Sequence, residues 1–185
     1  MCMETLRPTL WRTCRILANP IRLDLLRELF LAKELSVIAL ATRSGLPEKT
    51  AGIYLRAISA RGLISARPAG RWVFYTAKAN PSVDHASVLL SIVRECCNAG
   101  IANKEIIHYV TAFTHQRRID IVTGLQQKPM TVMEISLATQ ISPPALHRHL
   151  RKLLAREMVE RSGKYYTLKI PKNPLGQALL QAAIS

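Results

Sequence analysis

Two similar segments follow one another in this chain, and this repetition limits the fold more than any other feature. Residues 22–30 (RLDLLRELF) align with residues 118–126 (RIDIVTGLQ), and residues 35–64 align with residues 130–159. The first pair is offset by 96 positions and the second by 95, so one residue is gained or lost in a loop between them. Each segment then ends in a glycine-and-base turn with aromatic residues, GRWVFYT and GKYYT. Similarity in the same order over this length indicates two copies of one fold unit.

The same series of elements is predicted in each copy. Apolar residues at helical spacing predict a first helix. Ser36 and Thr131 are favoured N-cap residues for a short second helix. Pro47 and Pro143 suit the first turn of a third helix, where the missing N–H costs little. Because a β-hairpin follows, the predicted fold class is mainly α with small β-hairpin wings: tandem winged helix-turn-helix domains packed as a pseudo-dimer.

The chain divides into three predicted parts. Residues 1–80 form the first winged helix-turn-helix domain, and residues 114–185 form the second. Residues 81–113 form a helical linker and pairing region of two helices, broken near Asn98-Ala99-Gly100 because Asn and Gly favour helix ends. Apolar residues of this region, Val88 among them, need a surface to cover them. We therefore predict an intramolecular pseudo-dimer, and the sequence leaves open whether a further homodimer forms.

The charge of the chain points to a polyanionic partner. Its 26 Lys and Arg residues exceed its 12 Asp and Glu residues, which gives a formal net charge of +14. Such a balance favours nucleic acid as the partner. No run of about 18 apolar residues predicts a membrane span, and no basic amphipathic helix indicates a membrane surface. With no signal-peptide pattern and no CxxC spacing among the cysteines, the predicted location is cytoplasmic, associated with the nucleoid.

The third helix of the second copy has one apolar and one basic side. On a helical wheel of about 100° per residue, Leu146, Leu150 and Leu153 share one side, and the basic residues, Arg156 among them, lie opposite. Arg148 is the leading candidate for a base contact because arginine can bond a guanine edge with two hydrogen bonds. Arg151 and Lys152 are expected on phosphates. The predicted DNA contacts of this copy are Ser142, His147, Arg148, Arg151 and Lys152 on the helix and Arg161 and Lys164 on the wing.

The corresponding helix of the first copy has a less polar outer side. Gly52, Ile53 and Ala57 are expected to face outward there, and these residues offer few hydrogen bonds to bases. The second recognition helix is therefore predicted to be the stronger reader of DNA. The predicted contacts of the first copy are Lys49, Thr50, Tyr54 and Arg56 on the helix and Arg67 and Arg71 on the wing.

Metal binding and catalysis have little support. His147 and His149 are two residues apart, so about 200° of helical rotation separates them and they cannot share one ion. Cys96 and Cys97 also diverge, and Cys14 can join them only if its helix packs against the middle helices. We predict no metal site, with Cys14, Cys96 and Cys97 as the remaining alternative. The sequence has no nucleophile elbow or phosphate-binding glycine loop, so neither a cofactor nor an enzyme is predicted.

Two stretches carry a family resemblance. ANPIRLDLLREL and ISPPALHRHLRKLLAREMVERSGKYYTL resemble the ArsR-type (arsenic-repressor-like) winged-helix transcriptional regulators. The resemblance implies winged-helix domains that bind operator DNA, usually as homodimers with one domain per chain. A tandem copy departs from this pattern and implies a fused pseudo-dimer. The family's metal-binding cysteines are absent, since SVIAL and TVMEI stand at their positions.

The predicted function is therefore a DNA-binding transcriptional regulator that applies two winged-helix units of one chain to double-stranded DNA. Two alternatives remain. The first is a protein-interaction module in which Ile53 and its alanine neighbours form a contact patch. The second is an RNA-binding protein, which would use exposed aromatic residues on its hairpins.

Overall fold

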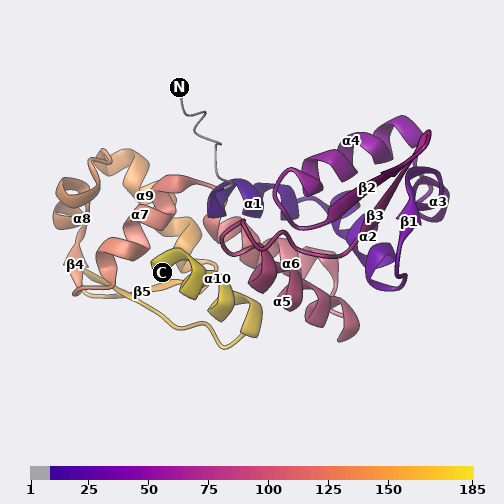
Figure 1. The fold of residues 1–185 in the computed structure, drawn as a ribbon. Helices are drawn as coiled ribbons and strands as arrows, with labels where there is room; N and C mark the ends of the chain where they lie inside the picture. Colours follow the sequence, from indigo (N-terminus) through magenta and orange to yellow (C-terminus); the bar gives the residue numbers. More distant parts are fainter. Residues whose placement is uncertain (1–8) are drawn as a thin grey trace, which may run out of the picture.

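The computed structural model describes residues 9–185, so Cys2 and the other residues of the amino-terminal stretch lie outside the described part. Figure 1 shows two groups of elements at opposite ends of the molecule, with several helices between them. The first half of the chain forms α1 (Leu10–Leu17), α2 (Pro20–Phe30), β1 (Leu35–Ser36), α3 (Val37–Arg43), α4 (Glu48–Ser59), β2 (Ser65–Ala69), β3 (Trp72–Thr76) and α5 (Ala86–Asn98).

The second half has the same order of elements, with one additional 3-10 turn. It forms α6 (Asn103–Val110), η1 (Thr111–Phe113), α7 (Gln116–Leu125), β4 (Met130–Thr131), α8 (Val132–Thr139), α9 (Pro143–Leu154), β5 (Val159–Ser162), β6 (Tyr165–Leu168) and α10 (Pro174–Ile184). The described chain is thus mainly helical with small antiparallel sheets, as expected from the sequence. The helix α10 was not predicted, and α1 was assumed only as the helix of Cys14, without bounds.

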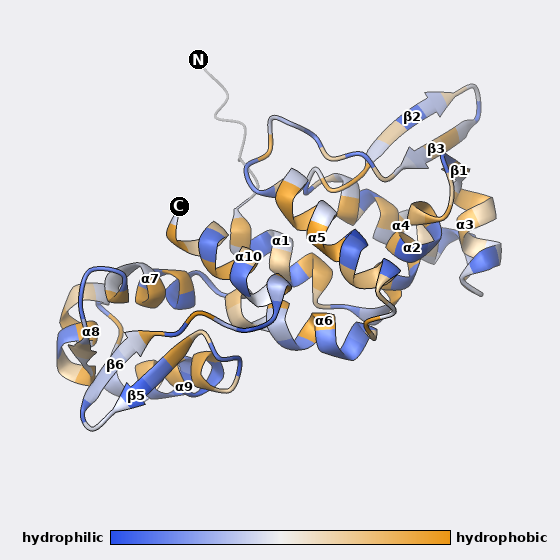
Figure 2. Cartoon of the chain, turned by 90° about the horizontal axis from the view of Figure 1, so that it is seen from below, coloured by the Kyte–Doolittle hydropathy of each residue, from blue (hydrophilic) through white to orange (hydrophobic). Residues whose placement is uncertain are grey.

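Two three-stranded antiparallel sheets have equivalent strand orders, β1-β3-β2 and β4-β6-β5. The hairpins β2–β3 and β5–β6 were predicted, but the third strand of each sheet was not. That strand has two residues, with Leu35 opposite Tyr75 and Met130 opposite Tyr166. Two residues are too few to produce a periodic pattern. Figure 2 shows the two hairpins extending from opposite ends of the molecule in opposite directions.

The starts of the short helices agree with the predicted caps. The Ser36 hydroxyl accepts a hydrogen bond from the Ala39 N–H, and Thr131 forms a capping box with Glu134. The prediction for the third helices needs one correction. Pro143 is the first residue of α9, but Pro47 stands one residue before α4, at the N-cap position. The helix α4 starts at Glu48, a residue that favours the positive end of the helix dipole.

The central helices provide the contact between the two halves. The break predicted between two middle helices is confirmed, since α5 ends at Asn98 and Gly100 has a φ of +73°. The helix α5 packs against α10, and α1 packs against α6 and η1. Val93 and Val110 are fully buried there, whereas Val88, which was expected to be covered, is 54% exposed. Within residues 9–185, no helix is long and apolar enough to cross a bilayer.

Candidate nucleic-acid interface

The helix α9 presents a cationic outer side above a buried leucine stripe. Leu146, Leu150 and Leu153 are at most 1% exposed, which fixes the rotation of the helix against its own domain. The opposite side is exposed to solvent and holds the residues predicted for DNA contact: His147, Arg148, Arg151 and Lys152. Ser142 is also exposed, at the N-cap position, where its side chain makes no capping hydrogen bond. All five residues are therefore accessible from solvent.

One basic residue assigned to this outer side lies elsewhere. The sequence wheel placed Arg156 with the exposed basic residues, but the residue follows the end of α9 and is half-buried. Its Nε donates a hydrogen bond to the Thr111 hydroxyl at 2.7 Å. Burial also lowers the pKa of Arg156. The side chain therefore joins α9 to η1, and it is a structural contact in this conformation.

The wing of the second half adds two cations beside aromatic rings. The Arg161 guanidinium lies 5.7 Å from the centroid of the Tyr166 ring, and its Nε donates to the Gly163 carbonyl at 2.8 Å. The Lys164 ammonium lies 5.5 Å from the Tyr165 ring. Neither cation forms an ion pair among the described residues. Both charges remain available to an anionic partner.

The outer side of α4 differs from that of α9. Lys49 and Arg56 are exposed, Thr50 is half-buried, and Ile53 is 49% exposed. Gly52 was predicted to face outward, but it is buried: a Cβ there would lie 3.6 Å from Arg56 Nη1 and 3.7 Å from a Val37 methyl group. At Gly52 the outer side of α4 is therefore covered by neighbouring side chains, although a helical wheel places this residue toward solvent.

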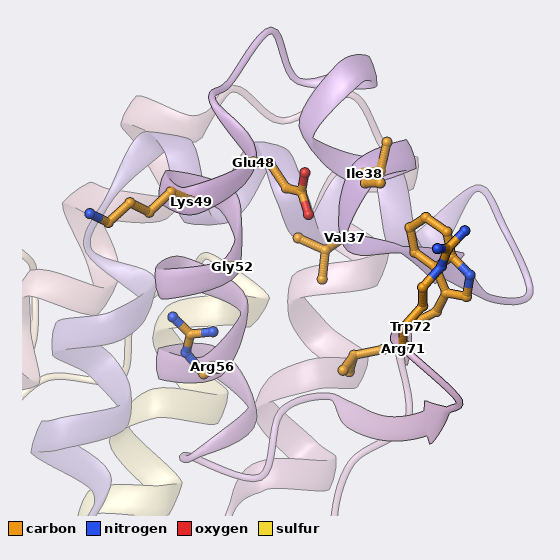
Figure 3. A pocket seen from close by; sticks show the side chains of 9 residues that line it. Val37, Ile38, Glu48, Lys49, Gly52, Arg56, Arg71 and Trp72 are labelled. Carbon is orange, nitrogen blue, oxygen red and sulfur yellow. The ribbon is translucent and has the colours of Figure 1, made fainter.

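A groove lies between α4 and the wing of the first half. It has a volume of about 580 Å³. Figure 3 shows Arg71 and Trp72 on the wing side, and Lys49 and Arg56 on α4. The Arg71 guanidinium lies 5.0 Å from the Trp72 ring centroid. The groove thus combines exposed cations with an exposed indole.

Two other predicted contacts of the first half are engaged within the protein. Arg67 forms two hydrogen bonds to the Glu34 carboxylate, at 3.0 and 2.6 Å, and these hold the pKa of Glu34 below its usual range. Tyr54 is half-buried, with the Arg22 guanidinium 5.3 Å from its ring centroid. The prediction of both residues as DNA contacts did not take these partners into account.

The two histidines of α9 are separated as the helical rotation required. His147 is exposed, whereas His149 is half-buried against His115, with ring centroids 4.8 Å apart. His115 was missed in the sequence, as were its exposed neighbour Arg117 and Arg15 on α1. The signal available was THQRRID, a run of polar and basic residues aligned with the more apolar ANPIRLD of the first copy.

The cysteines do not converge on a metal site in the described part of the chain. Among residues 9–185, no group of three or more His, Cys, Asp or Glu side chains could hold a metal ion. Cys14 is completely buried, and burial raises the pKa of its thiol to about 12 despite the nearby charge of Arg118. Burial also raises the pKa values of Cys96 and Cys97. These thiols stay protonated near neutral pH, the form that binds metals poorly.

The fold and this surface can be compared with known families. Residues 115–161 match the family model of bacterial regulatory proteins, arsR family. The matched segment contains α7, β4, α8, α9 and the start of β5. It is therefore similar to the helix-turn-helix of a family of regulators and not of enzymes. No curated protein matches the chain.

Proposed function

We propose that this protein is a DNA-binding transcriptional regulator in which α9 supplies the main contacts to bases. The observation that carries the proposal is the outer side of α9: three cations and a histidine above a buried leucine stripe, within the segment similar to arsR regulators. A helix of this kind fits the major groove of B-DNA. Arg148 contacts base edges with help from Ser142 and His147, while Arg151, Lys152, Arg161 and Lys164 contact phosphates.

The chain acts, in this proposal, as a tandem of two winged-helix units. The equal order of elements and the equivalent sheets support it. Backbone geometry supports it further, because Gly45 and Gln140 both have positive φ, at +63° and +55°, in the turns before α4 and α9. Gly62 and Glu157, at φ +69° and +58°, again occupy equivalent positions. The region of residues 81–113 is then divided, with α5 closing the first unit and α6 opening the second.

The contacts between the units have the character of a two-fold interface. The helix α1 packs against α6, its counterpart in the second unit, and α5 packs against its counterpart α10. Contacts between equivalent elements are typical of symmetric dimers. Arginines at equivalent positions also donate hydrogen bonds to equivalent carbonyls. Arg22 donates to the carbonyls of Arg15 and Ile16, and Arg118 donates to those of Thr111 and Ala112. These contacts support an intramolecular pseudo-dimer. Its proposed association with the nucleoid follows from the proposed binding of DNA.

The direct test is selection of duplexes from a random DNA library, followed by titration of the best duplex at several salt concentrations. Sequence-specific binding is expected, with log K falling by about 0.9 for each phosphate contact per unit of log salt. A scrambled duplex of equal composition serves as the control. Absence of duplex binding at low salt contradicts the proposal.

A protein-interaction module is the second candidate, and the groove beside α4 favours it. Ile38 and Trp72 line this groove and are 39% and 41% exposed, and Ile53, which follows the groove residue Gly52, is 49% exposed. Exposed apolar groups gathered at one place are typical of binding surfaces. The same titration separates the candidates, because a pure interaction module has no preference among duplex sequences.

A further inference from the structure

A pair of histidines lies where the start of α7 meets α9, and Arg15 of α1 is near enough for its charge to act on His115. His115 precedes α7, and its Nδ1 accepts a hydrogen bond from the Arg117 backbone N–H at 3.2 Å. His149 projects from α9, and the two rings lie 4.8 Å apart with an interplanar angle of 55°. Because Nδ1 of His115 acts as an acceptor, its proton is carried by Nε2. The pair thus joins the cap of α7 to the proposed recognition helix.

The groups around this pair are mostly cationic. Burial first, and then the charges of Arg118, Arg117 and Arg15, lower the pKa of His115, with Asp120 as the opposing charge. Burial, His115 and the arginines Arg118, Arg117 and Arg148 lower the pKa of His149 to about 4. Both imidazoles are therefore neutral near pH 7 in the free protein.

Three of these arginines are free to bind a ligand. The fourth, Arg118, donates its hydrogen bonds to the carbonyls of Thr111 and Ala112. The Asp120 carboxylate accepts a hydrogen bond from Gln116 at 2.9 Å. Arg15, Arg117 and Arg148 are exposed and form no ion pair among the described residues. The site therefore has a positive potential with little compensation.

The charge decides which ligand suits this junction. Two adjacent imidazoles can bind a metal ion, but the surrounding guanidinium groups repel a cation, and the described residues supply no third donor. The same guanidinium charges attract an anion and stabilise it in the site. A phosphate group suits them well because arginine fork geometry matches its oxygens. The location indicates the source, since Arg148 belongs to the outer side of α9 and Figure 1 shows α1 lying between α4 and α9.

We propose that Arg15, Arg117, His115 and His149 form a contact site for a phosphate of the DNA backbone beside the second recognition helix. This site rests on the proposed function, and it extends the interface from α9 onto α7 and α1. A phosphate bound beside the pair favours the charged form of imidazole. DNA binding is therefore accompanied by proton uptake at His149, since Nδ1 of His115 is occupied by the hydrogen bond from the Arg117 N–H.

The sign of the pH effect follows from the two states. The free protein holds His149 neutral, and the complex holds it charged, so affinity for DNA rises as pH falls. If the bound phosphate restores a pKa near 6.5, His149 contributes up to about a tenfold gain in affinity between pH 8 and pH 5.5. The free fold loses some stability below about pH 6.5, because the unfolded chain binds these protons more readily. Circular dichroism at each pH checks that the protein stays folded.

The first unit provides matched substitutions for the test. Asn19 and Tyr54 occupy the positions equivalent to His115 and His149. Asn19 caps α2 by accepting from the Arg22 N–H at 3.0 Å, so His115→Asn keeps a cap while removing a titrating group. His149→Tyr likewise keeps an aromatic ring. The selected duplex is titrated at about pH 5.5, 7 and 8 with the natural chain and with the double variant. The gain in DNA affinity between pH 8 and pH 5.5 is expected to be about tenfold larger for the natural chain than for the double variant.

Two controls make the outcome decisive. His108→Asn removes an exposed histidine on α6 and leaves the pH dependence unchanged. Arg15→Ala and Arg117→Ala are each expected to weaken binding about fivefold on all sequences alike, against less than about twofold for the exposed Lys104→Ala. An unchanged pH profile in the double variant overturns the proposal, and so do equal losses for Arg15→Ala, Arg117→Ala and Lys104→Ala. Failure of the proposed function itself is distinct, because the natural chain then binds no duplex specifically at any pH.

Discussion

The helices α4 and α9 have the same inner side and different outer sides. Both bury an apolar stripe against their own unit, but Gly52 and Ile53 stand in α4 where His147 and Arg148 stand in α9. The inner side is constrained by packing, since each change in volume there costs stability. The outer side is free of that constraint. Two segments with the same order of elements can therefore differ in what they bind, and function has to be argued from each surface separately.

The wings differ as the helices do, with the freer cations in the second half. In the first unit Arg67 is held by the Glu34 carboxylate. In the second unit Arg161 donates only to a backbone carbonyl, so its charge stays uncompensated. Together with α9, this wing concentrates free cations at the second unit. The first unit has fewer free cations on α4 and its wing, and three of them, Lys49, Arg56 and Arg71, line a groove with an exposed indole.

The largest expected difference between the two halves concerns Arg118 of α7 and its equivalent on α2, Arg22. Arg118 is 3% exposed and donates to the carbonyls of Thr111 and Ala112 and to the Thr114 hydroxyl. Arg118→Met leaves these acceptors unsatisfied and is expected to cost about 3 kcal/mol of unfolding free energy. Urea denaturation followed by circular dichroism measures this loss.

The matched variant is Arg22→Met in the first unit. Arg22 donates to two carbonyls at 3.3 Å, and its buried Nε has no hydrogen-bond partner within the described residues. We expect a loss of about 1 kcal/mol. Equal losses for the two variants would mean that the difference in burial has no energetic consequence.

Much of the fold could be predicted because local chemistry specifies it. The caps at Ser36 and Thr131, the break after Asn98 and the two hairpins all have short-range signals. The strand pairing of Leu35 with Tyr75 could not be predicted, because a two-residue strand exists only through its tertiary partner. The helix α10 and the bounds of α1 were missed since the repeat alignment did not reach them.

The candidate interface was predictable where helical rotation determines exposure. Leu146 and Arg148 lie on the sides that the wheel assigned to them. Rotation does not reveal what lies opposite a side chain, so the partners of Arg67, Arg156 and His149 came only from the structure. Gly52 was placed wrongly because a residue without a side chain is covered by its neighbours.

The next comparison concerns discrimination among DNA sequences. Arg148→Ala is expected to reduce the preference for the selected duplex over a mismatched one by about 1–3 kcal/mol. Arg56→Ala is expected to change this preference by less than about 0.5 kcal/mol, because its guanidinium lies over Gly52 on a largely apolar helix surface. Arg151 is the equivalent of Arg56, and Arg151→Ala should weaken all duplexes alike. Competition between the two duplexes measures each value, and equal losses at Arg56 and Arg148 would remove the proposed inequality.

The smallest expected effect tests whether the Glu34 carboxylate reduces the DNA affinity of the first wing by pairing with Arg67. Glu34→Gln removes the charge that holds Arg67, and both side chains lie at the surface, where such pairs contribute little to stability. The freed guanidinium should raise DNA affinity about twofold at about 50 mM salt and have no effect at about 300 mM, where screening is stronger. Glu95→Gln on α5 makes the same change in net charge away from the wing, so it separates a local gain from a general one. If both variants gain equally, the first wing does not contact DNA, and the difference between the units is larger than their folds imply.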